Sequence, residues 1–171
     1  MNKQNVGLFR IWNRSKGEEM INESVEKLWE NFKLQNPTLP DCYELMTFGD
    51  TQDRADQSAA LVLEGLKTVK TTLLLEYQRK EKYLPQEGSY SIILDVNNQA
   101  IGIVQLLKVF IVPFDEVTDE LAYQEGEGDR TLSGWREIYQ TYFQEQCKKQ
   151  HWNFSVKTEV VCIQFELVYA A

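Results

Sequence analysis

The sequence predicts an α+β fold, in which a small, curled sheet or β-barrel is flanked by helices. The expected strands and helices do not alternate regularly along the chain, as they would in a doubly wound parallel sheet. Two β-runs at residues 89–94 (SYSIIL) and 100–112 (AIGIVQLLKVFIV) are separated by DVNNQ. Because the two Asn in this link tolerate a positive φ, we expect an antiparallel hairpin here.

Three segments have the features of longer helices. In residues 19–34 apolar side chains recur every three or four positions, and the Asn-Pro pair at 36–37 ends the helix because the residue before Pro avoids the α region. A second helix is expected over residues 53–64, with Gly65 as its C-cap. A third helix follows Thr131, its N-cap, through WREIYQTYFQEQCKKQ.

The other expected elements are shorter. Residues 69–75 (VKTTLLL) predict a strand or short buried segment, residues 114–123 a short helix, and residues 158–169 a final strand. Residues 1–18 are mixed polar and aromatic and are expected to form an N-terminal arm. Since no linker is evident, residues 19–171 are predicted to form a single domain that includes the N-terminal helix.

Composition limits the possible classes of function. Of the 171 residues, 43% are hydrophobic and 26% are charged, as is typical of a globular protein. The net charge of -8 argues against binding to duplex DNA or to an anionic membrane, which requires a basic surface. The sequence has no signal-peptide core and no apolar run near the ~20 residues of a membrane span. These features predict a cytoplasmic protein without a membrane partner.

Cysteine and histidine usage argues against a disulfide framework or a metal site. The chain has three Cys, which is an odd number, and no two of them have CxxC spacing, so we expect reduced thiols. The only His is His151, which rules out a metal site built from several His. The glycine-rich nucleotide-binding, zinc-protease and serine-hydrolase motifs are also absent from the sequence. We therefore expect no metal and no cofactor.

The first candidate site is the segment GLKTVKTT at residues 65–72. In an extended chain, Lys67 and Thr71 share one face, whereas Lys70 and Thr72 share the other. A Lys in a walled cleft holds a phosphate or an oxyanion, or becomes a base if burial lowers its pKa. The alternative is a solvated edge strand, where Lys side chains discourage pairing with other strands.

The second candidate site is GEGDRTLSGW at residues 126–135. Glycines flank Glu127 and Asp129 and let the backbone bend sharply. A carboxylate on such a loop is suited to general acid–base chemistry. The alternative is a charged loop and helix cap, in which Asp129 or Thr131 caps the next helix.

Local charges suggest that the two segments face each other. Residues 65–84 contain five basic and two acidic residues, a net charge of +3. Residues 115–130 contain seven acidic residues and one basic residue, a net charge of -6. Opposed charges of this kind predict a polarised cleft, although most charged runs are solvated faces.

Several segments together resemble the ASCH family, a branch of the PUA-like superfamily. Their order and spacing are similar to those of bacterial ASCH-domain proteins over about residues 44 to 169. The segments are FGD at 48–50, LVLEGLKTVKTTLLLEY at 61–77, VPFDEV at 112–117, EGEGDRTLSGWREIYQTYF at 125–143 and VVCIQFELVY at 160–169.

The resemblance implies a PUA-like fold, a small β-barrel with helices around it and a cleft on one side. It also implies a function related to RNA. Some small members of the family hydrolyse the acetyl amide of acetylated cytidine nucleosides, and one type is described as a ribonuclease. The hydrolases use a Lys, a Thr three positions later and a Glu on a later loop. The Lys corresponds to Lys67 and the Glu to Glu127, with Glu125 or Asp129 as alternatives. The Thr position is occupied by Lys70.

We therefore expect an RNA-, nucleotide- or modified-nucleoside-binding protein with a polar cleft. The alternatives are a metal-independent amidohydrolase acting on acetylated cytidine-type nucleosides, or a protein-interaction domain. The candidate catalytic residues are Lys67, Glu127 and Thr71, with Thr72 as the other neighbouring hydroxyl. The candidate ligand-binding residues are Phe48, Asp50, Lys70, Tyr77, Asp129, Arg130 and Trp135.

Overall fold

The structure is a computed structural model that describes residues 22–40, 42–49 and 51–171. These residues form two compact units, and each unit draws on separate stretches of sequence. The first unit contains the described residues up to Ala59, together with Tyr90–Val104 and Val168–Ala171. The second contains Ala60–Ser89 and Gln105–Leu167. The predicted single domain over residues 19–171 stays a prediction.

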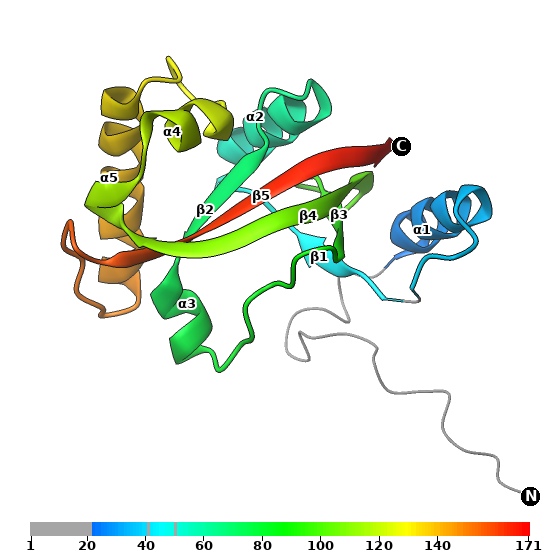
Figure 1. Cartoon of the computed structure of the whole chain (residues 1–171), viewed down its shortest axis with the longest axis horizontal. Coiled ribbons are helices and arrows are strands. Elements are labelled where there is room, and N and C mark those ends of the chain that lie inside the picture. Colours follow the sequence, from blue (N-terminus) through cyan, green and yellow to red (C-terminus); the bar gives the residue numbers. More distant parts are fainter. Residues whose placement is uncertain (1–21, 41, 50) are drawn as a thin grey trace, which may run out of the picture. The chain divides into compact units, whose positions relative to one another are not determined.

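Five strands pair in the order β1-β3-β4-β5-β2. β1 (Glu44–Met46) pairs in parallel with β3 (Tyr90–Leu94), whereas β2 (Val69–Leu73) pairs antiparallel with β5 (Glu159–Ala170). The long strand β4 (Ala100–Pro113) lies beside β5 (Figure 1). The sheet is mixed, with both a parallel and an antiparallel pair among these strands, and this confirms the predicted α+β class.

The first unit is built around helix α1 (Glu23–Gln35). Asn22 caps this helix, because its side chain accepts hydrogen bonds from the backbone N–H groups of Ser24 and Val25. One face of α1 is buried against residues of β3 and β4, as the three-and-four spacing predicts. The buried side chains of this core are Val25, Leu28, Trp29, Phe32, Ile92, Leu94, Ala100 and Ile103.

The second unit is built around helix α5 (Leu132–Lys149). Thr131 caps it as predicted, since its hydroxyl accepts a hydrogen bond from the Gly134 N–H. Every fourth residue of α5 is buried and faces β2, β5 and the short helices η1 (Phe114–Glu116) and α4 (Asp119–Glu125). The α5 residues in this core are Trp135, Tyr139, Phe143 and Cys147.

Two parts of the secondary structure differ from the expectation. The predicted strand ends at Leu73, and helix α3 (Leu74–Arg79) begins directly after it. A short apolar run does not distinguish a strand from a helix, and the polar residues that follow it, Glu, Gln and Arg, are good helix formers. The three-residue strand β1 was not predicted. The predicted arm, and the helix residues before Asn22, lie outside the described residues.

The other predicted elements are present. Helix α2 (Gln52–Leu63) and the hairpin between β3 and β4 occur where expected, and Asn98 in the turn has a φ of +59°. No helix within the described ranges is long and apolar enough to cross a membrane. Cys42, Cys147 and Cys162 are free thiols, and only Cys42 is exposed.

Truncation of one α1 side chain tests the packing of this helix. Leu28 is 6% exposed, so Leu28→Ala is expected to lower the free energy of unfolding by about 2–5 kcal/mol. Leu34, on the same helix, is 80% exposed, so Leu34→Ala should change it by no more than about 0.5 kcal/mol. Urea unfolding measures both variants. Equal losses would show that α1 does not pack through the Leu28 face.

Candidate functional site

Lys67 lies in the link between α2 and β2, in the second unit. Gly65 has a φ of +72°, which lets the chain turn sharply at the end of α2. The backbone N–H groups of Leu66 and Lys67 both donate to the Leu61 carbonyl, at 2.8 and 3.0 Å. The last turn of the helix therefore fixes the backbone from which the Lys67 side chain extends.

The loop after α4 packs directly on this link. Thr68 donates its backbone N–H to the Gln124 carbonyl at 2.8 Å. Gly126 has a φ of +77°, and a Cβ added there would lie only 2.7 Å from the Leu66 carbonyl oxygen. Glycine is thus required at position 126 for two reasons, its backbone conformation and the close approach of the two segments.

The buried ammonium of Lys67 joins the two segments. Its Nζ donates to the Glu125 carbonyl oxygen at 3.1 Å and to Glu127 Oε1 at 2.9 Å, and it also contacts Glu125 Oε2. An ammonium has three N–H donors, and these three contacts can engage all of them. The predicted proximity of Lys67 and Glu127, sixty residues apart, is confirmed. Their catalytic roles stay predictions.

Tyr139 connects the two carboxylates to the aromatic core. Its hydroxyl lies 2.8 Å from Glu125 Oε2 and 3.4 Å from Glu127 Oε1. Its ring stacks on Trp135, with the ring centres 4.8 Å apart. We refer to Lys67, Glu125, Glu127 and Tyr139 as the buried cluster. Within it, only Glu127 keeps an appreciable fraction of its side chain, 26%, exposed to solvent.

The cluster changes the acid–base properties of its members. Burial by itself would lower the pKa of Lys67, but the charges of Glu125 and Glu127 outweigh it and raise the pKa above its ordinary value. Burial and the same two carboxylates raise the pKa of Tyr139 well above its ordinary value. Lys67 is therefore an ammonium at neutral pH and Tyr139 a neutral hydrogen-bond donor, so Lys67 is not a general base here.

Lys70 has the opposite electrostatic environment. It lies in β2 opposite Ile163 of β5. Burial lowers its pKa to about 8; Glu76 opposes this shift, whereas the positive charge of Lys67 adds to it. A substantial fraction of Lys70 is therefore uncharged slightly above neutral pH.

The two hydroxyl residues after Lys70 face opposite sides of β2, as the strand alternation predicts. Thr71 is buried with the core, and its hydroxyl lies 3.9 Å from Cys162 Sγ. The Thr72 hydroxyl is buried and has no hydrogen-bond partner among the described residues. No hydrogen bond within the described part of the chain joins Thr71 to Lys67 or Glu127, so the predicted role of Thr71 as a nucleophile gains no support.

Three other predicted ligand-binding residues have structural contacts. Asp129 accepts hydrogen bonds from the Thr131 N–H and hydroxyl, at 2.9 and 2.7 Å, and these bonds lower its pKa. The Arg130 guanidinium lies 3.7 Å from the centre of the Tyr123 ring. Trp135 is 2% exposed and stacks between Phe114 and Tyr139, so neither of its ring faces is open for a base. These contacts favour the alternative of a charged loop and helix cap.

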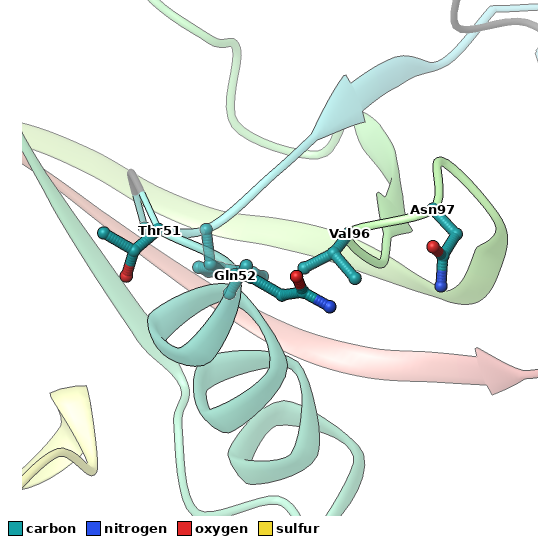
Figure 2. A pocket seen from close by; sticks show the side chains of 7 residues that line it. Thr51, Gln52, Val96 and Asn97 are labelled. Atoms are coloured by element: carbon teal, nitrogen blue, oxygen red, sulfur yellow. The ribbon is translucent and has the colours of Figure 1, made fainter.

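The remaining predicted residues are Tyr77, which is half-buried on α3, Phe48 in the first unit, and Asp50. Phe48 lines a pocket of about 320 Å³ but is itself 4% exposed, so its ring forms part of a wall. Figure 2 shows Thr51 and Gln52 at the start of α2, with Val96 and Asn97 from the β3–β4 turn. Asp50 lies outside the described residues.

Comparisons with known proteins identify the family. The sequence profile of the ASCH domain matches residues 44–169. The chain belongs to the ASCH domain family. The ASCH domain of Lactobacillus crispatus JV V101 has a similar structure, with a TM-score of 0.80 and 22% identity over 87% of this chain and 96% of that one. Protein EF3133 of Enterococcus faecalis V583 also gives 0.80, at 31% identity over 86% and 89%.

The structural likeness confirms the predicted PUA-like fold of this ASCH domain. No functionally curated protein matches the chain. In the described part of the chain, no three His, Cys, Asp or Glu side chains gather into a group that would hold a metal ion.

Sequence reasoning gave no role to two members of the buried cluster. Glu125 entered only as an alternative to Glu127, and Tyr139 had no functional assignment. One signal was available for Tyr139: it lies four residues after Trp135 on the buried face of α5, where a phenol hydroxyl requires a partner. No comparable signal in the sequence shows that Glu125 is buried whereas Glu127, two residues later, is partly exposed.

Substitution of Gly126 tests the contact between the two segments. Gly126→Ala places a Cβ against the Leu66 carbonyl in addition to straining a positive φ. Gly88→Ala is the matched control, because Gly88 has a φ of +80° but nothing within 4 Å of an added Cβ. Both variants lose about 1–2 kcal/mol from backbone strain. Gly126→Ala should lose about 1–3 kcal/mol more from overpacking, as measured by urea unfolding. Equal losses would contradict the close packing.

The lowered pKa of Lys70 makes stability depend on pH. Between about 8 and its ordinary value of 10.5, the unfolded chain binds more protons at Lys70 than the folded chain does. The free energy of unfolding attributable to this group therefore rises with pH across that window. The raised pKa of Lys67 and of Tyr139 has the opposite sign and lowers stability at higher pH.

A comparison with Lys70→Met isolates this effect. Unfolding free energies of the wild type and of Lys70→Met are measured from pH 7 to pH 10. The wild type should gain stability relative to the variant as pH rises above about 8. A difference that is constant with pH would show that the Lys70 ammonium is well solvated in the folded protein.

Proposed function

We propose that this ASCH domain binds a nucleotide or a modified nucleoside of RNA, and that the contacts are made around the buried cluster. The observation that carries the proposal is the Lys67–Glu127 pair. Two segments sixty residues apart place a buried ammonium 2.9 Å from a carboxylate that is still partly exposed. Paired charges withdrawn from water are costly, and groups whose pKa values are perturbed by burial and a charge partner cluster at functional sites. The resemblance to RNA-associated ASCH proteins supports the same class of ligand.

The charges of the cluster suggest how such a ligand is held. Lys67 carries one positive charge against the two carboxylates of Glu125 and Glu127, which leaves little attraction for a phosphate at Lys67 itself. The exposed part of Glu127 is a hydrogen-bond acceptor and suits the N–H groups of a base. Lys70 is the second lysine near the cluster, and its ammonium is a cation that suits a phosphate.

Binding of cytidine, uridine, their monophosphates and a short single-stranded RNA tests this proposal by calorimetry. Glu127→Gln should weaken nucleoside binding about tenfold, the value of one hydrogen bond to a charged group. Glu137→Gln is the matched control, because Glu137 is exposed on α5. Affinity for the phosphorylated ligands should fall with added salt, whereas affinity for the nucleosides should not. The proposal fails if no nucleoside or nucleotide binds, and a protein-interaction domain would then be favoured.

The second candidate function is hydrolysis of an acetylated cytidine-type nucleoside. Glu127 beside an ammonium is suitably placed to accept a proton from an attacking water, while the positive charge of Lys67 stabilises negative charge on the acyl oxygen. The family's Thr position holds Lys70, and the Thr71 hydroxyl faces Cys162. A covalent route through a Thr therefore lacks support, and attack by water is the route that remains.

Restoration of the family's residue tests this second candidate. Lys70→Thr should raise the hydrolysis of acetylated cytidine above that of the wild type, because it supplies a hydroxyl and removes a cation. The same change should weaken binding of phosphorylated ligands. Chromatography of the released cytidine measures the first effect and calorimetry the second. Efficient hydrolysis by the wild type that is abolished by Thr71→Ala or Thr72→Ala would show instead that a neighbouring Thr is the nucleophile.

A further inference from the structure

The buried cluster contains one carboxylate that is withdrawn from solvent. Glu125 is the last residue of α4 and is fully buried, with 1% of its side chain exposed. Its Oε2 contacts the Lys67 ammonium and lies 2.8 Å from the Tyr139 hydroxyl. Its backbone carbonyl also accepts from Lys67 Nζ at 3.1 Å. Glu125 therefore holds Lys67 through both its side chain and its main chain.

A buried charge without an opposite charge beside it is strongly unfavourable. Lys67 cannot move toward solvent without leaving the Glu125 carboxylate unpaired in the interior. Glu127, in contrast, is 26% exposed and can exchange its contact with Lys67 for a contact with a ligand. The two carboxylates have the same charge and touch the same ammonium, but only Glu127 is accessible.

Tyr139 fixes the cluster from the opposite side. Its ring stacks on Trp135 at an interplanar angle of 17°, and it contacts the ring of Phe143 edge to face. The hydroxyl is thereby held at 2.8 Å from Glu125 and 3.4 Å from Glu127. A single O–H placed between two carboxylates reduces their mutual repulsion. Because the pKa of Tyr139 is raised well above its ordinary value, this donor is not lost near neutral pH.

We propose that Glu125 and Tyr139 are positioning residues, which hold Lys67 against Glu127 so that Glu127 is the group that meets the ligand. This inference rests on the proposed function for its ligand, but the arrangement can be tested without one. The titratable groups that face Lys67 are Glu125 from α4, Glu127 from the following loop and Tyr139 from α5. Lys70 of β2 is close enough for its charge to interact with that of Lys67.

The first arm of the test follows the titration of Lys67 by NMR of lysine side-chain carbons, with Lys67→Met to assign the signal. Glu125→Gln keeps the shape of the side chain and removes its charge. The Lys67 midpoint should then move to lower pH than in the wild type, because one of the two carboxylates that raise its pKa is gone. An unchanged midpoint would overturn the role of Glu125.

The second arm uses Tyr139→Phe, which keeps the stacked ring and removes only the hydroxyl. The Tyr139 hydroxyl and the Lys67 ammonium both contact Glu125 Oε2. Loss of the hydroxyl should therefore leave the titration midpoint of Lys67 at the pH of the wild type or above it, whereas Glu125→Gln should lower that midpoint. A purely structural role would loosen the cluster and lower the midpoint in both variants. Tyr123→Phe is the control, because Tyr123 is 55% exposed on α4. If Glu125→Gln does not fold, the titration of Tyr139→Phe still tests whether the cluster positions Lys67.

The third arm measures binding of cytidine and of cytidine monophosphate. Tyr139→Phe should weaken binding about tenfold, because Glu127 stays paired with Lys67 but loses the hydroxyl contact that orients it, whereas Tyr123→Phe should not. If the wild type binds neither ligand, the proposed function fails while the Lys67 titrations still test the positioning. If the wild type binds and Tyr139→Phe binds equally well, the positioning role of Tyr139 is wrong.

Discussion

The contact between the Lys67 ammonium and the Glu125 carboxylate is the interaction on which the second unit most depends. Both side chains are almost fully withdrawn from water, at 2% and 1% exposure, so neither charge is tolerable without the other. The contact joins the end of α4 to the start of β2, and Tyr139 extends it to α5. Removing one partner of such a pair typically costs more than the pair contributes, because it leaves a buried charge unmatched.

The same contact divides the chemical roles among the neighbouring groups. Lys67 is kept as an ammonium and Tyr139 as a neutral donor, and Glu127 is the member of the buried cluster whose side chain is partly exposed. Lys70 differs from Lys67 because burial, only partly opposed by the charge of Glu76, lowers its pKa to about 8. Two lysines three positions apart therefore have different protonation behaviour, because the charges of Glu125 and Glu127 outweigh burial at Lys67, whereas burial is the largest effect at Lys70.

Each compact unit has its own aromatic core. In the first unit, Trp29 of α1 packs with Phe32, Tyr43 and Tyr90. In the second, Phe114, Trp135 and Tyr139 stack in sequence, and Phe143 lies against the same group. The last ring of this stack, that of Tyr139, carries the hydroxyl that reaches both carboxylates. Trp135, one of the predicted ligand-binding residues, is packed inside this core.

The sequence by itself determined the α+β class, most elements and the pairing of Lys67 with Glu127. Apolar spacing, caps and turn residues are local signals, and the family resemblance joined two segments that no local rule connects. Helix α3 and strand β1 escaped prediction because short segments take their conformation from tertiary packing. Only the tertiary structure decided that Glu125 is buried while Glu127 is partly exposed, that Tyr139 bridges them, and that Thr71 faces Cys162. Burial and side-chain direction depend on what the rest of the chain packs against each residue, which spacing along the sequence does not encode.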